Sequence, residues 1–288
     1  MSIDPTKNFT IHFTTTDPLL MDCLPPNIRE LLEKDLRIGA NEGEAKTKEE
    51  AVEKTPLTFD YKMVNCNQDL KILTNKLKKS KIKQYGMLLY GVSGAGKSYY
   101  AQWLAQELKM PIIKKRASDL NDKFVGQTEN NIRNAFKEAK EQKAILLFDE
   151  ADSFLFDRKY SQQNYQVTSV NEVLTQMEDH PYPFIMTTNL KDKIDNAALR
   201  RFIFKIKYEY MKSENIQSGV KTYFGKEFKL NKEQLTQLKY ITSGDFKVAK
   251  AKIDILDGGN YTNERIFEYL LKEQEEKEII QGSNKINF

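Results

Sequence analysis

A glycine-rich segment that ends in a lysine and a serine is the clearest chemical signal in the sequence. The segment is Gly91-Val92-Ser93-Gly94-Ala95-Gly96-Lys97-Ser98, which fits the pattern Gly-x-x-x-x-Gly-Lys-Ser/Thr. Glycines let backbone N–H groups curl around phosphate oxygens, and a helix that begins at the end of the segment adds positive potential. We therefore expect Lys97 to meet the β- and γ-phosphates of a nucleotide and Ser98 to hold Mg²⁺.

Carboxylates follow a second apolar run in the position where a metal and a water molecule would need them. Residues 144–148 read as a buried strand, and Asp149 and Glu150 come directly after it. Strand ends at one edge of a parallel sheet share a crevice with a phosphate loop. Asp149 is then expected to support Mg²⁺ and Glu150 to polarise the attacking water, although strands that merely end in solvated acids are common.

An amide and two arginines complete the set of residues that could act on a phosphate. Asn189 follows the apolar run 184–188, where its amide could orient water or a γ-phosphate oxygen. Arg200 and Arg201 end the next expected helix. Guanidinium groups can stabilise the negative charge on a γ-phosphate in the transition state. The alternative is that the two arginines only cap the C-terminal end of the helix, where positively charged side chains are also favoured.

These residues need a sheet to position them, and the hydrophobic pattern supplies one. Strand candidates alternate with helical stretches, at Met87–Tyr90, Pro111–Arg116, Ala144–Phe148, Phe184–Thr188 and Phe202–Tyr208. This alternation predicts an α/β fold with a parallel sheet flanked by helices on both faces. We expect an arm or linker over residues 1–60 with one short helix at Asn27–Lys34, a nucleotide-binding domain over 61–209 and a small all-helical domain over 210–288.

Together these motifs resemble the AAA+ ATPases, and within them the AAA clade of protein-remodelling enzymes, over roughly residues 60 to 260. The resemblance implies a P-loop fold followed by a helical lid. Gly91–Ser98 would be Walker A, Asp149 and Glu150 Walker B, and Asn189 sensor 1. Arg200 and Arg201 would be arginine fingers. The sequence departs from the clade in the Walker A residues Val92, Ser93 and Ala95.

The same resemblance assigns a substrate loop and an adenine pocket. Lys123-Phe124-Val125-Gly126 is similar to the first pore loop, in which Phe124 would grip a threaded polypeptide, although Gln127 stands where the clade usually has glutamate. Physical reasoning alone favours a buried core role for such an aromatic residue. Val64 and Asn65 occupy the place of the adenine-binding segment. Lys247 lies where other AAA+ families carry a sensor 2 arginine, but this clade often lacks that residue and an ordinary surface lysine is the favoured alternative.

Composition narrows the classes of protein that remain. The chain has 288 residues with 40% hydrophobic and 30% charged residues, typical of a soluble globular protein. Its net charge of +4 gives no general drive toward nucleic acid or membranes. Neither a leader pattern nor metal-ligand spacing of Cys and His is present, so we expect a cytoplasmic protein without structural zinc.

Three functions fit these expectations, and all of them use ATP and Mg²⁺. The first is an ATP-hydrolysing ring, a homo-oligomer expected to be a hexamer, that unfolds or remodels a client protein. The second is an ATP-gated scaffold with slow hydrolysis. The third is a nucleic-acid motor, suggested by Lys114-Lys115-Arg116 and by five lysines between residues 76 and 83. Lysine clusters usually form only a solvent-exposed face of a helix or sheet, so we do not expect nucleic acid as the partner.

Overall fold

The computed structural model describes residues 57–120, 126–152, 164–190 and 194–283. The chain divides into two units, residues 1–55 and 56–288, and all features below belong to the second. The expected helix at residues 27–34 lies outside the described residues, as does nearly all of the expected arm.

A six-stranded sheet with the order β1-β6-β2-β5-β4-β3 forms the centre of this unit. Its strands are β1 (Asn65–Cys66), β2 (Gly86–Gly91), β3 (Ile112–Arg116), β4 (Ile145–Asp149), β5 (Phe184–Thr188) and β6 (Phe202–Glu209). The five predicted strands are present and pair parallel with one another. The prediction missed β1, a two-residue strand that pairs antiparallel with the end of β6.

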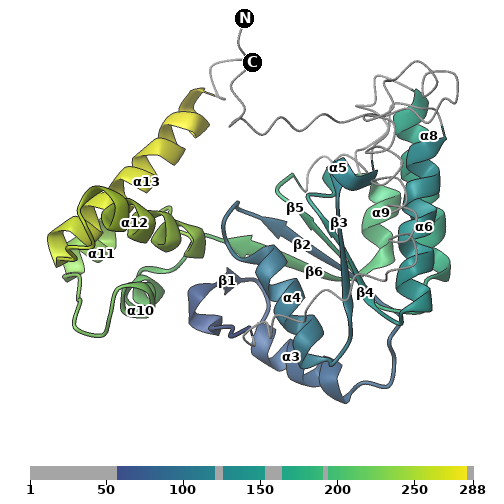
Figure 1. Cartoon of the computed structure of the whole chain (residues 1–288), viewed down its shortest axis with the longest axis horizontal. Helices are drawn as coiled ribbons and strands as arrows, with labels where there is room; N and C mark the ends of the chain where they lie inside the picture. The colour runs from purple at the N-terminus through teal and green to yellow at the C-terminus, as the bar shows by residue number, and fades with distance from the viewer. Residues whose placement is uncertain (1–56, 121–125, 153–163, 191–193, 284–288) are drawn as a thin grey trace, which may run out of the picture. The chain divides into compact units, whose positions relative to one another are not determined.

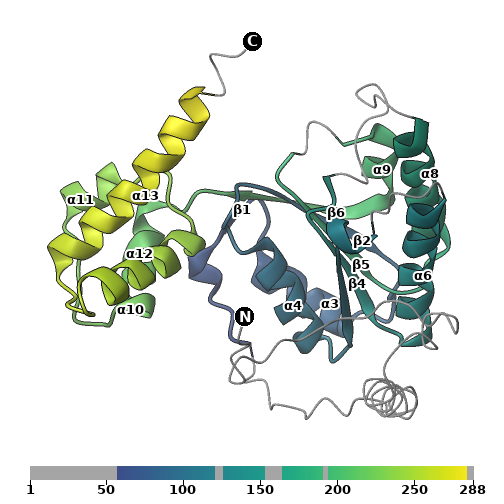
Figure 2. The ribbon, with the colours of Figure 1, turned by 45° about the horizontal axis from the view of Figure 1, so that its top comes forward.

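Helices cover both faces of the sheet, as the alternating pattern predicted (Figures 1 and 2). The first part of the unit holds η1 (Tyr61–Met63), α3 (Leu70–Lys79), α4 (Lys97–Glu107), α5 (Ala117–Leu120), α6 (Gln127–Glu141), α8 (Asn164–Asp179) and α9 (Asn196–Arg201). Ile145 and Leu147 of β4 pack with α3 and α4, whereas Leu146 and Phe148 pack with α6, α8 and α9. Successive strand residues point to opposite faces, so β4 is buried on both sides.

A group of helices with its own core follows the sheet. It comprises α10 (Ser213–Tyr223), α11 (Lys232–Gln237), α12 (Ser243–Leu256) and α13 (Asn263–Ser283). Phe246 and Ile253 of α12 are fully buried there with Ile216, Ile266 and Leu270. Among the described residues, no helix is both long and apolar enough to cross a membrane.

The sheet brings the chemically active ends of its strands to one edge. β2, β4 and β5 are adjacent and parallel, so they end on the same side. The glycine-rich loop follows β2, Glu150 follows β4 and Asn189 follows β5. Residues distant in sequence therefore meet in one crevice, which is where open parallel sheets bind ligands.

Candidate active site

The glycine-rich loop is shaped by three glycines in left-handed backbone conformations. Gly91, Gly94 and Gly96 have φ values of +123°, +73° and +88°. At Gly91 a Cβ atom would lie 2.0 Å from the carbonyl oxygen of Tyr208, so no other residue fits. The loop and the first turn of α4 line a pocket of about 290 Å³, and α4 begins without a side-chain cap. This cradle fits a phosphate group at a helix N-terminus.

Lys97 lies at the bottom of this loop and is 8% exposed. Its Nζ donates hydrogen bonds to the carbonyl oxygens of Gly91 at 3.0 Å and Val92 at 2.8 Å, and to Asn189 Oδ1 at 2.7 Å. Burial lowers the pKa of Lys97 to about 8, and the nearby carboxylates of Asp152 and Asp149 oppose that shift. The ammonium group thus connects the expected Walker A loop, through hydrogen bonds, to the expected sensor 1 residue, Asn189.

Asp149 is surrounded by hydrogen-bond donors. Ser98 donates to its Oδ1, Thr187 Oγ1 donates to the same oxygen at 2.7 Å, and Lys114 Nζ lies 2.6 Å from Oδ2. Burial by itself raises the pKa of Asp149, but the hydrogen bonds from Lys114, Ser98 and Thr187 outweigh it and hold the pKa below its ordinary value. An ionised carboxylate beside a hydroxyl is the hard oxygen donor set that Mg²⁺ prefers.

Glu150 has an unusual backbone conformation at the end of β4. Its φ is +60°, uncommon for a residue with a side chain. Its backbone N–H donates to Thr187 Oγ1 at 3.0 Å, and the N–H of Ala151 donates to the Thr187 carbonyl at 2.9 Å. These bonds to β5 offset the backbone strain, which commonly occurs at functional sites. The exposed Glu150 side chain belongs to the lining of the phosphate pocket.

The two arginines at the end of α9 have different surroundings. Arg201 donates to the Ala197 carbonyl at 2.8 Å and forms an ion pair with Glu178 of α8. Arg200 is exposed, and the structure gives it no hydrogen bond or ion pair with any residue that it describes. Neither arginine is among the residues that line the phosphate pocket.

Comparison with known proteins identifies the part of the chain that carries this site. The model of the family described as "ATPase family associated with various cellular activities (AAA)" matches residues 87–210. The chain contains an AAA ATPase domain. This confirms the family that the motifs indicated, and it agrees with the observed sheet and helices.

Several known proteins are similar to part of this chain. An uncharacterized protein, ORF529, of Acidianus two-tailed virus is 32% identical over 175 residues, which cover 54% of this chain and 33% of that protein. The peroxisomal ATPase PEX1 of Saccharomyces cerevisiae is 37% identical over 121 residues, 40% of this chain and 12% of PEX1. Spastin of Xenopus tropicalis is 30% identical over 167 residues, 55% of this chain and 28% of spastin. The chain thus matches at most a third of these relatives' lengths.

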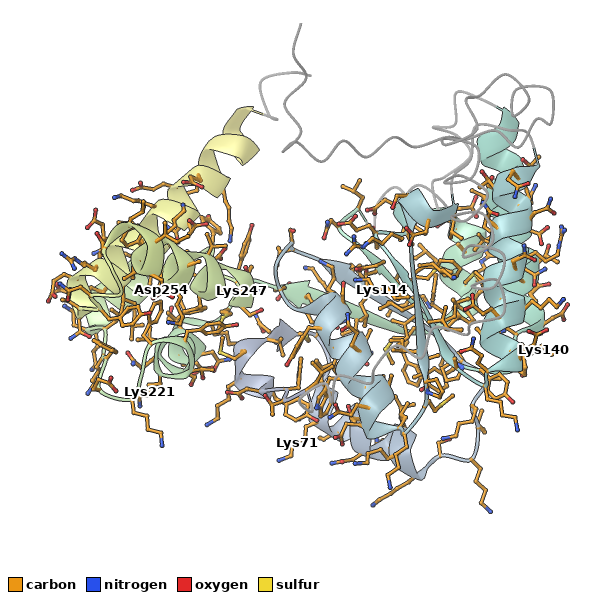
Figure 3. All side chains as sticks on the ribbon, viewed as in Figure 1. Lys71, Lys114, Lys140, Lys221, Lys247 and Asp254 are labelled. Carbon is orange, nitrogen blue, oxygen red and sulfur yellow. The ribbon has the colours of Figure 1, made fainter. Side chains whose placement is uncertain are left out.

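The helical region touches the AAA domain directly at the glycine-rich loop. The N–H of Gly244 donates to the Gly94 carbonyl at 2.9 Å, and Ser243 Oγ donates to the same oxygen at 3.0 Å. A Cβ atom at Gly94 would lie 2.8 Å from Thr242 Oγ1, so this approach also needs a glycine. Lys247, one turn further along α12, is exposed (Figure 3). The contact to the loop therefore comes from the start of α12.

The expected adenine segment lies beside the same loop. Val64 Cγ1 is 3.6 Å from the position that a Cβ of Gly96 would take. Asn65 begins β1, and its Nδ2 donates to the Tyr210 carbonyl at 2.8 Å. Asn65 also lines a second hollow of about 680 Å³ with residues 91–93, Asn189, residues 207–210 and Lys277. This hollow shares Ser93 and Asn189 with the lining of the phosphate pocket, so the two adjoin.

Three of the four expected pore-loop residues, Lys123, Phe124 and Val125, lie outside the described residues. Gly126 is exposed, has a φ of +85° and precedes α6. Apart from its chain neighbours, no described residue has a heavy atom within 4 Å of the position that its Cβ would take. The described part of this segment is therefore an open turn at the start of a helix.

Thr187 and Lys114 also contact Asp149 in the site, and neither was predicted from the sequence as a site residue. Strand register could have indicated Thr187, because Phe148 pairs with Met186 and the next residues, Asp149 and Thr187, then lie side by side. Lys114 was grouped with a basic cluster instead. Its ammonium binds Asp149, and that of Lys115 lies 2.9 Å from Glu138, so both lysines of this pair are matched by acids.

Proposed function

We propose that this chain is an ATP-hydrolysing ring motor that remodels or unfolds a client protein, working in the cytoplasm. The observation that carries the ATPase part is the convergence of two hydrogen-bonded pairs, Lys97 with Asn189 and Ser98 with Asp149, in the lining of one pocket at the glycine-rich loop. The loop and Lys97 would bind the phosphates, and Ser98 with Asp149 would hold Mg²⁺, which neutralises phosphate charge when bound. Val64 and Asn65 would contact the base.

Hydrolysis in this proposal depends on Glu150 and Asn189. Glu150 accepts a proton from the water that attacks the γ-phosphorus, and the bond from that phosphorus to the bridging oxygen of ADP breaks. Asn189 holds Lys97 through its amide oxygen, which leaves its Nδ2 donors for a phosphate oxygen or the water. The products are ADP and inorganic phosphate.

The arrangement of the arginines supports a site shared between subunits. Among the described residues, those that line the phosphate pocket include one lysine, Lys97, and no arginine. Arg200 is exposed at the end of α9, whereas Arg201 is bound within its own chain. Arg200 is therefore the finger that reaches the γ-phosphate of a neighbouring subunit, and Arg201 fixes the end of α9.

Separate alanine substitutions distinguish these two roles. Arg200→Ala is expected to lower ATP turnover by about 10³-fold, the order of an arginine finger, without changing the unfolding temperature. Arg201→Ala is expected to lower the unfolding temperature because it leaves Glu178 and the end of α9 without their partner. Turnover, ATP affinity and thermal unfolding are measured on both variants. Equal turnover in wild type and Arg200→Ala would contradict the assignment.

The client-gripping role of Phe124 rests on the resemblance of its segment to an AAA pore loop. Unfolded casein, a generic polypeptide probe, is expected to stimulate ATP hydrolysis by the wild-type chain. Phe124→Ala is expected to abolish that stimulation while basal turnover stays within about twofold. The exposed Ile72→Ala, on α3, is the matched control for loss of a surface apolar residue. Stimulation that survives in Phe124→Ala would favour the ATP-gated scaffold over the threading motor.

A further inference from the structure

Lys114 is a second cation at the site, and the roles above do not use it. It lies in β3, beside β4, and pairs in register with Leu147, two residues before Asp149. Its Nζ lies 2.6 Å from Asp149 Oδ2, and the side chains of Lys114 and Asp149 are 31% and 13% exposed. Figure 3 labels Lys114 on the sheet. A partly buried ion pair of this length is much less screened by salt than a surface pair.

The groups around Asp149 contact different oxygens of its carboxylate. Ser98 and Thr187 both donate to Oδ1, and Lys114 contacts Oδ2. A metal ion held by Ser98 would face Oδ1, with the Lys114 ammonium only one carboxylate group away. Like charges this close repel strongly in a partly buried site, because the separation is shorter than the Debye length of about 8 Å at physiological salt.

We propose that Lys114 neutralises the charge of Asp149 in the absence of nucleotide. As a result, this carboxylate binds magnesium only together with nucleotide phosphates. Lys114 cancels the negative charge that would attract a divalent ion to the protein alone. The phosphates of ATP restore enough negative charge to outweigh the lysine. The inference rests on the proposed function for the role of Asp149 as the magnesium carboxylate.

Lys115 provides a matched control on the same strand. It is the next residue of β3, and it also forms an ion pair, at 2.9 Å, with Glu138 of α6. Successive strand residues point to opposite faces, so Lys115 shares the strand and the ion-paired state with Lys114 but points away from the site. Substitution of Lys115 tests whether loss of any β3 lysine changes metal binding.

The test measures binding of Mn²⁺ alone, by electron paramagnetic resonance, to the full chain without nucleotide. Mn²⁺ prefers the same oxygen ligands as Mg²⁺. Lys114→Met is expected to bind Mn²⁺ at least about tenfold more tightly than wild type, and Lys114→Gln likewise. Lys114→Arg, which keeps the charge, and Lys115→Met are expected to stay within about threefold of wild type. Fluorescence of the single tryptophan, Trp103 on α4, checks that each variant is folded.

A second substitution tests whether the change in Mn²⁺ affinity depends on the Asp149 carboxylate. In an Asp149→Asn background, Lys114→Met is expected to leave Mn²⁺ affinity unchanged, because the group that Lys114 neutralises is gone. Equal or weaker Mn²⁺ binding by Lys114→Met and Lys114→Gln, relative to wild type, would overturn the inference. This measurement needs neither ATP nor hydrolysis. A chain that fails to hydrolyse ATP but gains Mn²⁺ affinity on losing Lys114 would refute the proposed function and leave the role of Lys114 standing.

Discussion

Glu150→Gln is expected to abolish most ATP hydrolysis, by a factor on the order of 10² to 10⁴, while ATP affinity stays near that of wild type. The amide has the shape of the carboxylate but does not take a proton from water. The backbone at Glu150, with its φ of +60° and its bond to Thr187, is the same for either residue, so the fold is not expected to change. Phosphate release and equilibrium binding of labelled ATP measure the two effects separately.

Glu141→Gln is the matched control for this prediction. Glu141 ends α6, is exposed and is not among the residues that line the phosphate pocket. Loss of one surface carboxylate there is expected to leave turnover unchanged. If Glu150→Gln hydrolyses ATP as fast as this control, Glu150 is not the general base.

Lys97→Ala is expected to weaken ATP binding by about a hundredfold or more, because charge-assisted hydrogen bonds to phosphate are lost. The substitution also leaves the carbonyl oxygens of Gly91 and Val92 and the amide of Asn189 without their donor. We therefore expect some loss of stability, about 1–3 kcal/mol, in addition to the loss of binding. Titration with labelled ATP and thermal unfolding are the measurements.

Lys71→Ala separates the specific effect of Lys97 from a general loss of positive charge. Lys71 is an exposed lysine on α3, labelled in Figure 3, and lies outside the lining of the phosphate pocket. Its removal is expected to change neither ATP affinity nor stability. ATP affinity in Lys97→Ala equal to that of Lys71→Ala would contradict the role of Lys97 as the phosphate ligand.

Local pattern was enough to predict the strands that carry the site. The apolar runs of β2, β4 and β5 are short, buried on both faces and bounded by glycine, proline or polar residues, so their ends could be located within about a residue. Parallel strands then had to bring the loop, Asp149 and Asn189 to one edge. β1 was not predicted because Asn65-Cys66 is too short to show any periodicity. This strand forms only through its pairing with β6.

Contacts between elements could not be predicted from spacing. The reach of the Lys114 side chain to Asp149 depends on strand register and on a flexible four-carbon stem. The same limit applied to Arg200 and Arg201, which are adjacent in sequence but differ in their partners because only Arg201 faces Glu178. The approach of α12 to Gly94 joins residues 149 positions apart. Such pairings are set by tertiary packing and not by local sequence.

We propose that each nucleotide site takes Glu150 from one subunit and Arg200 from its neighbour, and mixing two inactive variants tests this shared site most directly. Glu150→Gln supplies an intact Arg200, and Arg200→Ala supplies an intact Glu150. With random mixing in equal amounts, about a quarter of the sites combine both intact residues across a subunit boundary, so ATP turnover is expected to recover to about that fraction of wild type. A mixture as inactive as its separate components would contradict the shared site.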